Sequence, residues 1–409
     1  MTDVARLSTL RYGLHTDAYT FTGTPSFVPL RLTDDGASFL PRNRTPIPRA
    51  LRSLSGRRYS HIRGVQDTAD ITVATEFRGV NSNTGGAVSD WEAKMEQGYL
   101  LASLFGAVAP STSSTASTVD STGHTPASGI LQVVSGTNYA IGQVIGFATS
   151  DGFEVGRIAN KATNVLTLDH PYTGTPTTGA TVFRAAVYTV DDDVTHHVHA
   201  MFSAEGEDWR RDYFGCTPMS MALALPNAGL VTMSSVFSPT SFADVVEDDP
   251  AHAEPTAGSP IVVDACRVWF AGANVIARDI AISYSAAAQV RTASTRTNGK
   301  LGGVCSTGDG KTFTVEFSVY VGDGNLAGEI QDSTGTPSLN ALLGDSDTSG
   351  TPSTTRKLSV QFGSAVGACG YAYLPEADCQ VTTQHVDGLT VARVVATGTG
   401  ALPAILAVL

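Results

Sequence analysis

The sequence has little charge and few cysteines. Only 16% of its 409 residues are charged, and the five cysteines are scattered, with no C-x-x-C pair. This spacing argues against a disulfide framework and against a zinc knuckle, so we expect free thiols that are mostly buried. The net charge of −12 argues against a protein that clamps nucleic-acid phosphates.

Long apolar runs are also missing. The best one, Ala401–Leu409, is far shorter than the roughly 20 residues that a membrane helix needs. The first residues, Met1–Arg6, show no basic region followed by an apolar one, so no secretory signal is visible. We expect a chain that is soluble where it is made and binds no membrane.

No motif of a catalytic or metal site stands out. The sequence has no glycine-rich phosphate loop, no nucleophile elbow and no His/carboxylate constellation, although catalytic residues can converge from distant positions. In the cluster His196-His197-Val198-His199, His197 and His199 would share one face of a strand, but no carboxylate-rich pattern around them and no further nearby His supports a metal site. We therefore expect no enzyme activity, no catalytic residues, no metal and no cofactor.

The composition favours β structure. The chain contains 41 glycines, and its hydrophobic fraction of 42% is enough to bury a core. Apolar residues alternate with polar ones over residues 70–77 and 312–321, as in half-buried strands. A Ser-x-x-Glu capping box at Ser89 and Glu92 starts a helix that we expect to end at Gly106. We predict a mainly β fold with a few short helices (α+β).

The two halves of the chain show a weak repeat. Ala74–Phe77 and Thr314–Phe317 share the ending Glu-Phe, and a leucine-rich segment ending in glycine follows in each half, at residues 100–106 and 339–344. Within the first half, residues 108–183 begin with a Ser/Thr-rich linker and continue as a compact β pattern. We expect two β-sandwich or barrel lobes and a small inserted β-barrel.

The expected domain boundaries follow from these patterns. They are an N-terminal arm at 1–68, a first lobe at 69–107 plus 184–245, the linker and insert at 108–183, an acidic linker at 246–260, and a second lobe at 261–409. The arm carries a basic block without an acidic residue between Asp35 and Asp67, formed by Arg42, Arg44, Arg49, Arg52, Arg57, Arg58 and Arg63. Prolines break any helix there, so we expect an extended arm or long loop, either solvated or in contact with an acidic partner surface.

The ordered set of features resembles the tail tube (major tail) proteins of long, non-contractile-tailed bacteriophages. The resemblance covers most of residues 65–400 without the insert. Each segment that carries it is a loose match to the family when taken alone, and the order of the segments makes the resemblance. The segments are 72–77, 99–107, Phe214–Met221 entering a hairpin, 278–284, 313–321, and Gly370–Pro375.

The resemblance implies a structural virion protein. Such a protein polymerises as stacked rings into a tube through which double-stranded DNA passes without specific binding during genome ejection. It is made in the host bacterial cytoplasm and ends in the virion tail, with tape-measure, tail terminator and distal tail proteins as further partners. Because the family presents about six tube units per ring and this chain holds two, we expect trimeric, pseudo-sixfold rings rather than hexamers.

Candidate contact residues follow from this hypothesis. The seven arginines would bind a neighbouring subunit or ring, and the polar strand faces would line the lumen through Thr72, Glu76, Thr314 and Glu316. The alternative hypothesis is a β-rich cell-surface or secreted binding module, with the insert as its ligand-binding part; the lack of a visible secretory signal counts against it.

Overall fold

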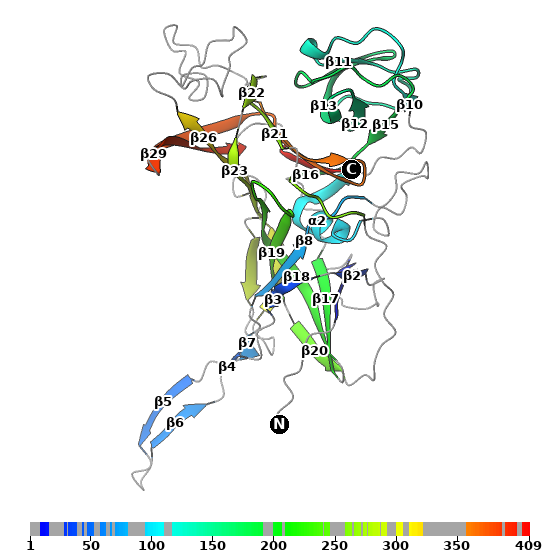
Figure 1. The fold of residues 1–409 in the computed structure, drawn as a ribbon. Coiled ribbons are helices and arrows are strands. Elements are labelled where there is room, and N and C mark those ends of the chain that lie inside the picture. The colour runs from blue at the N-terminus through cyan, green and yellow to red at the C-terminus, as the bar shows by residue number, and fades with distance from the viewer. Residues whose placement is uncertain are drawn as a thin grey trace.

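A computed structural model shows a mainly β protein built from several sheets (Figure 1). The structure describes residues 9–15, 28–80, 95–109, 117–190, 199–263, 266–321, 357–398 and 403–409, apart from gaps at 31, 39–42, 45–46, 53–57, 63–65, 68–69, 207–208, 240, 246–257, 271–272, 276, 287, 293–299, 306–310 and 387–388. Within these residues there is one α-helix and one short 3-10 helix. The expected fold class, mainly β with few helices, is confirmed.

The largest sheet has twelve strands. Eight of them follow one another in the antiparallel order β3-β8-β19-β18-β23-β26-β30-β29. Their bounds are β3 Leu32–Ser38, β8 Ile71–Glu76, β19 Thr232–Ser238, β18 Trp209–Leu225, β23 Arg278–Ser285, β26 Thr312–Val321, β30 Leu389–Gly398 and β29 Ala377–Val386. The N-terminal half of β18 also pairs with β17 (His199–Gly206) and β20 (Ser241–Val245), and β17 continues to β1 (Thr9–His15) and β2 (Val28–Leu30).

A seven-stranded sheet covers the apolar side of the largest one. Its order is β22-β21-β27-β28-β31-β16-β9, with β22 Ala273–Val275, β21 Arg267–Phe270, β27 Leu358–Ala365, β28 Ala368–Leu374, β31 Ile405–Val408, β16 Ala186–Val190 and β9 Gly106–Ala109. Side chains from both sheets form a single buried core, for example Val73 and Leu223 with Val360 and Leu406. This burial of apolar area is the main stabilising contribution to the fold.

The one described α-helix, α2 (Gly98–Phe105), lies in this core. Leu100, Leu101, Leu104 and Phe105 are buried, and the helix passes directly into β9 at Gly106. The predicted end of the helix is therefore correct, whereas the expected capping box at Ser89 and Glu92 lies outside the described residues. Phe105 stacks on Tyr284 with 4.8 Å between ring centroids, which connects the helix to the largest sheet.

The insert is a separate six-stranded sheet with its own core. Its order is β10-β15-β12-β13-β14-β11, with β10 Ser117–Thr118, β15 Thr181–Arg184, β12 Val144–Thr149, β13 Gly152–Ala162, β14 Val165–Leu168 and β11 Ile130–Gln132; the 3-10 helix is η1, Pro126–Ser128. Its core contains Leu131, Phe147, Ile158 and Leu166. Only Ala185 separates β15 from β16, so the chain passes from the insert into the seven-stranded sheet without a linker.

Three short ladders complete the fold: β4 (Asn43–Arg44) with β7 (Gln66–Asp67), β5 (Ile47–Arg52) with β6 (Arg58–Ile62), and β24 (Ala288–Thr292) with β25 (Lys300–Cys305). The β5–β6 hairpin extends away from the other sheets (Figure 1). Residues 1–68 thus differ from the extended arm or loop that we expected, because β1, β2 and β3 join the largest sheet and part of the basic block forms a hairpin.

The two expected lobes share their sheets. β18, from residues assigned to the first lobe, pairs with β23 from the second, and the seven-stranded sheet also combines strands of both. The physical reason is that each half alone would leave one strand with an unpaired edge, β18 in the first half and β23 in the second. Pairing these two edges satisfies the backbone hydrogen bonds of both strands.

We expect Phe105→Ala to destabilise the fold by about 3–5 kcal/mol, because it opens a cavity between α2 and the largest sheet. Phe105 is fully buried and also lies 6.1 Å from Phe313 and 6.3 Å from Tyr188, between ring centroids. Urea unfolding followed by circular dichroism measures the loss. Thr178→Ala, at an exposed turn, is the control and should stay within about 0.5 kcal/mol of the unaltered chain. A cost below 1 kcal/mol for Phe105→Ala would contradict this account of the core.

Candidate functional site

The candidate site is the face of the eight-stranded path that points away from the core. Along β8 and β26 buried residues alternate with partly exposed ones, so each strand has one apolar and one small polar face. The partly exposed face is formed by Thr, Ser and Ala on the central strands: Thr72, Ala74, Ser220, Ala222, Ala224, Thr232, Ser234, Ala281, Ser283, Ser285 and Thr314.

The two glutamates predicted for the lumen lie on this face, in a single row. The strand registers connect them directly, because Glu76 pairs with Thr232, Thr232 with Ala224, Ala224 with Ala281, and Ala281 with Glu316. Thr72 and Thr314 lie on the same face, on β8 and β26. The structure therefore brings all four predicted residues to one sheet surface.

Both glutamates carry an arginine partner. Glu76 Oε2 accepts a hydrogen bond from Arg78 Nη2 at 2.6 Å, and Arg78 Nε also lies 3.7 Å from the buried carboxylate of Glu96. Glu316 is paired with Arg393 from β30, and its carboxylate raises the pKa of that guanidinium. The sequence analysis did not predict these pairs. Arg393 reaches Glu316 only through the pairing of β26 with β30, whereas the spacing of two residues between Glu76 and Arg78 was visible in the sequence. The face carries less net negative charge than its glutamates suggest.

The eight-stranded path also repeats its connectivity. We call β3-β8-β19-β18 the N-terminal unit and β23-β26-β30-β29 the C-terminal unit. Along the chain, the strands of the N-terminal unit follow one another as β3, β8, β18 and β19, and those of the C-terminal unit as β23, β26, β29 and β30. In both units the fourth strand lies between the second and the third in the sheet. Since every neighbouring pair is antiparallel, corresponding strands of the two units run in the same direction. The weak sequence repeat falls on corresponding strands, β8 and β26.

The basic block is only partly described. Arg44 lies in β4, Arg49 and Arg52 in β5, and Arg58 in β6, whereas Arg42, Arg57 and Arg63 lie outside the described residues. Arg52 and Arg58 are direct neighbours across the β5–β6 ladder. Two like charges in directly opposed positions destabilise a strand pair, and an isolated two-stranded hairpin is marginal on its own. The hairpin would gain stability from a negatively charged surface.

A second feature, which sequence patterns did not predict, joins the insert to the seven-stranded sheet. Gln361 of β27 donates from Nε2 to the carbonyl of Phe153 at 2.8 Å, and its Oε1 accepts from the backbone N–H of Val155 at 3.0 Å. Next to this clamp, the fully buried carboxylate of Glu154 pairs with Arg267 of β21 and accepts from Thr173 Oγ1 at 2.8 Å. The sequence signal that could have indicated this ion pair was the charged residue Glu154 between the apolar residues Phe153 and Val155 of β13.

Apolar packing continues the junction. One buried cluster combines insert residues with the seven-stranded sheet: Val144, Phe153 and Val155 with Cys369, Tyr371, Tyr373, Ile405, Ala407 and Leu409. His170 of the insert stacks on Trp269 of β21 at 3.9 Å between ring centroids. The insert is therefore fixed to the main body by a continuous core, although it has a core of its own.

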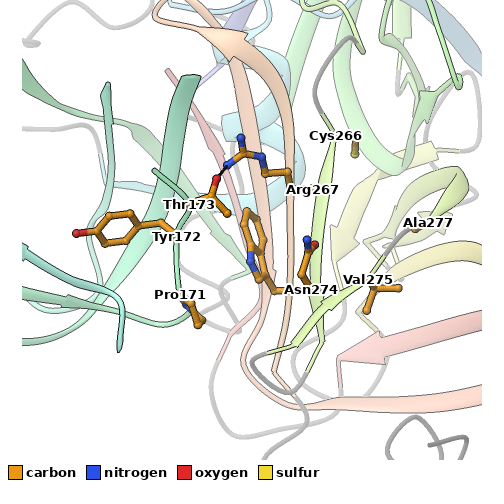
Figure 2. A pocket seen from close by; sticks show the side chains of 9 residues that line it. Pro171, Tyr172, Thr173, Cys266, Arg267, Asn274, Val275 and Ala277 are labelled. Carbon is orange, nitrogen blue, oxygen red and sulfur yellow. Dashed lines mark hydrogen bonds between the residues drawn. The ribbon is translucent and has the colours of Figure 1, made fainter. Parts of the chain in front are cut away.

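A pocket of about 350 Å3 lies at the edge of this junction (Figure 2). Its lining includes Tyr172 and Thr173 from the insert, and Arg267, Asn274 and Val275 from β21 and β22. Arg267 points at Thr173 and donates to its hydroxyl at 3.0 Å. Burial raises the pKa of the Cys266 thiol to about 12, so this lining thiol stays protonated at neutral pH and is a poor nucleophile.

The described part of the chain contains neither a cluster of metal ligands nor a helix suited to crossing a membrane. No group of three or more His, Cys, Asp and Glu side chains gathers there as a metal site would require, and His196 and His197 lie outside the described residues. Among those same residues, no helix has the length and apolar character needed to cross a bilayer.

Comparison with known proteins gives no relative: no protein-family model matches the chain, and no curated protein matches it.

We expect the junction to weaken in mild acid because of His170. Burial is the main cause that lowers the pKa of His170 to about 4; the Pro171 carbonyl and Asp169 oppose the shift, and Arg267 makes the smallest contribution, which also lowers the pKa. In the unfolded chain the imidazole binds its proton near pH 6.5, so between about pH 6.5 and 4 the unfolded state holds more protons and stability falls as the pH falls. At pH 5 this linkage amounts to about 2 kcal/mol.

Urea unfolding at pH 7, 6 and 5, followed by tryptophan fluorescence, measures this effect. His170→Phe keeps a ring on Trp269 but cannot be protonated, so its loss of stability between pH 7 and 5 should be about 2 kcal/mol smaller than that of the unaltered chain. Equal losses in the two proteins would show that His170 does not control the acid response.

Proposed function

We propose that this chain is a structural subunit that polymerises as stacked rings into a phage-type tail tube, a channel for the passage of double-stranded DNA. The observation that carries the proposal is the eight-stranded path, with two four-strand units of the same order and direction side by side. A curved wall can be extended by adding further units in the same way, and closing such a wall removes its open strand edges.

The chemistry of the two sheet faces supports this function. One face is covered by the seven-stranded sheet and its apolar core, and the other carries small side chains in which Glu76 and Glu316 are paired with arginines. A surface lining a DNA channel has to avoid binding phosphates tightly while remaining hydrated. Small hydroxyl and methyl side chains with locally balanced charge meet both requirements. We propose Thr72, Glu76, Thr314 and Glu316 as lumen residues.

The basic hairpin supports stacking between rings. It lies apart from the other sheets (Figure 1) and carries Arg49, Arg52 and Arg58. The whole chain has a net charge of −12 and no acidic residue between Asp35 and Asp67, so the remainder of the chain is more acidic still. A second copy is therefore a suitable electrostatic partner for the hairpin.

The number of chains per ring tests the proposal. Two units per chain and about six units per ring, the number implied by the resemblance to tail tube proteins, give three chains with approximate sixfold symmetry. We expect negative-stain images of the purified, concentrated chain to show rings or tubes, and native mass measurement of an isolated ring to give three copies. Six copies would contradict the two-unit ring. A dispersed monomer at all concentrations would instead favour the binding-module alternative.

Replacing Arg49, Arg52, Arg57 and Arg58 together by Gln should prevent tube growth, because the hairpin would lose its attraction to the acidic neighbour. Light scattering and electron microscopy measure assembly. The circular dichroism spectrum and the unfolding midpoint should be unchanged, since the hairpin lies outside the main core.

The matched control replaces the same four arginines by Lys, which keeps the charge; it should still assemble, with weaker stacking because lysine lacks the planar fork of donors. Normal tube growth by the Gln variant would show that the hairpin is not the stacking contact.

A further inference from the structure

The strand pairing inside the chain suggests how one copy meets the next. Within the chain, the third strand of the N-terminal unit, β18, pairs with the first strand of the C-terminal unit, β23. The ends of the path are the complementary strands. β3, the first strand of the N-terminal unit, and β29, the third strand of the C-terminal unit, each have a single partner strand in the described part of the chain.

The outer edge of β29 is unusual for a protein that stays monomeric, whereas β3 carries Asp34, Asp35 and a register shift opposite β8. Natural edge strands are commonly kept short or carry lysine, proline or bulges that prevent pairing with another chain. β29 has ten residues, Ala-Asp-Cys-Gln-Val-Thr-Thr-Gln-His-Val, with neither lysine nor proline and a regular ladder to β30. Such an edge is a template for another strand.

We propose that β29 of one copy pairs with β3 of a second copy in an antiparallel ladder that repeats the β18–β23 junction. The proposal deepens the tube function and rests on it, because it names the surfaces that would close the ring. The direction of the strands is compatible: the path contains an even number of alternating strands, so β3 and β29 run in opposite directions.

The internal junction also predicts the register. One buried row crosses the whole path: Leu32 pairs with Thr75, Thr75 with Met233, Met233 with Leu223, Leu223 with Ile282, Ile282 with Val315, Val315 with Ala396, and Ala396 with Cys379. Leu32 is the residue of this row in the first strand of the N-terminal unit, and Ile282 is its counterpart in the first strand of the C-terminal unit. Leu223 and Cys379 are likewise counterparts in the third strands of the two units. Since Leu223 faces Ile282, Cys379 of one copy should face Leu32 of the next.

Burial at the two ends of the row agrees with this arrangement. Leu223, Ile282 and Val315 are at most 1% exposed, whereas Cys379 is 8% exposed and Leu32 is partly buried, although all of them face the core. A neighbouring copy would extend the same apolar layer over the two end residues. The contact would thus combine backbone hydrogen bonds with continued burial.

Hydrogen exchange of the unaltered chain tests the strand pairing. On assembly, the amides of β3 and β29 should exchange at least about tenfold more slowly, because their outer edges become hydrogen-bonded. β11 of the insert, whose side away from β14 is already hydrogen-bonded to Asp120 and Thr125, is the internal control and should change much less. Assembled tubes in which β3 and β29 gain no protection would overturn the pairing while leaving the tube function intact.

A cysteine pair tests the register. Opposed residues of antiparallel strands have Cα atoms about 4.5–5.5 Å apart, within the range that a disulfide spans. Leu32→Cys in the otherwise unaltered chain should give covalent dimers and larger products on oxidation of the assembled sample, seen on a non-reducing gel. Leu32→Cys combined with Cys379→Ser should give none, and Thr33→Cys, whose side chain points to the opposite face, should give several-fold less.

The outcomes of the two experiments are distinct. If Leu32→Cys forms tubes but no linked products beyond those of the double variant, the register is wrong. If the unaltered chain never assembles, the tube function fails, and the edge pairing fails with it. Should Leu32→Cys itself fail to fold, the exchange experiment still decides the strand pairing.

Discussion

The hydrogen-bonded junction between β18 and β23 is the contact on which the rest of the structure depends. It joins strands from the two halves of the chain into one surface, so that neither half keeps an open edge at the centre of the molecule. The seven-stranded sheet can then cover both halves with one apolar core. Without this junction, the small polar face would be two separate patches, and Glu76 and Glu316 would not lie in one row.

The insert has a different physical relation to the body. Its own core would suffice for a small domain, but the Gln361 clamp, the buried Glu154–Arg267 pair and the aromatic stack on Trp269 hold it in one orientation. Burying a carboxylate and a guanidinium is costly unless both find partners, so this junction stabilises one docking geometry more than it adds net stability. A decoration held so firmly would keep a constant position around the outside of a tube.

Sequence patterns predicted the parts of the fold that depend on local alternation. The strands at 70–77 and 312–321 and the helix end at Gly106 follow from the spacing of apolar residues and turn residues. The patterns did not reveal the shared sheets, because strand partners distant in sequence leave no periodic signal. They also missed β1–β3: β3 contains Asp34-Asp35-Gly36 and a register shift opposite β8, so its alternation is interrupted. The same limit applies to the ion pair of Glu316 and to the junction residues, since each depends on a long-range contact, whereas Arg78 stands only two residues from Glu76.

The length of β18 has a mechanical consequence. Its 17 residues run from the ladders with β17 and β20 to those with β19 and β23, with register shifts near Gly215 and at Pro218. A load applied along this strand is carried by many hydrogen bonds at once, in shear, and cannot peel them apart one after another. The strand therefore connects the two ends of the sheet, and the molecule should resist stretching along this direction more than across it.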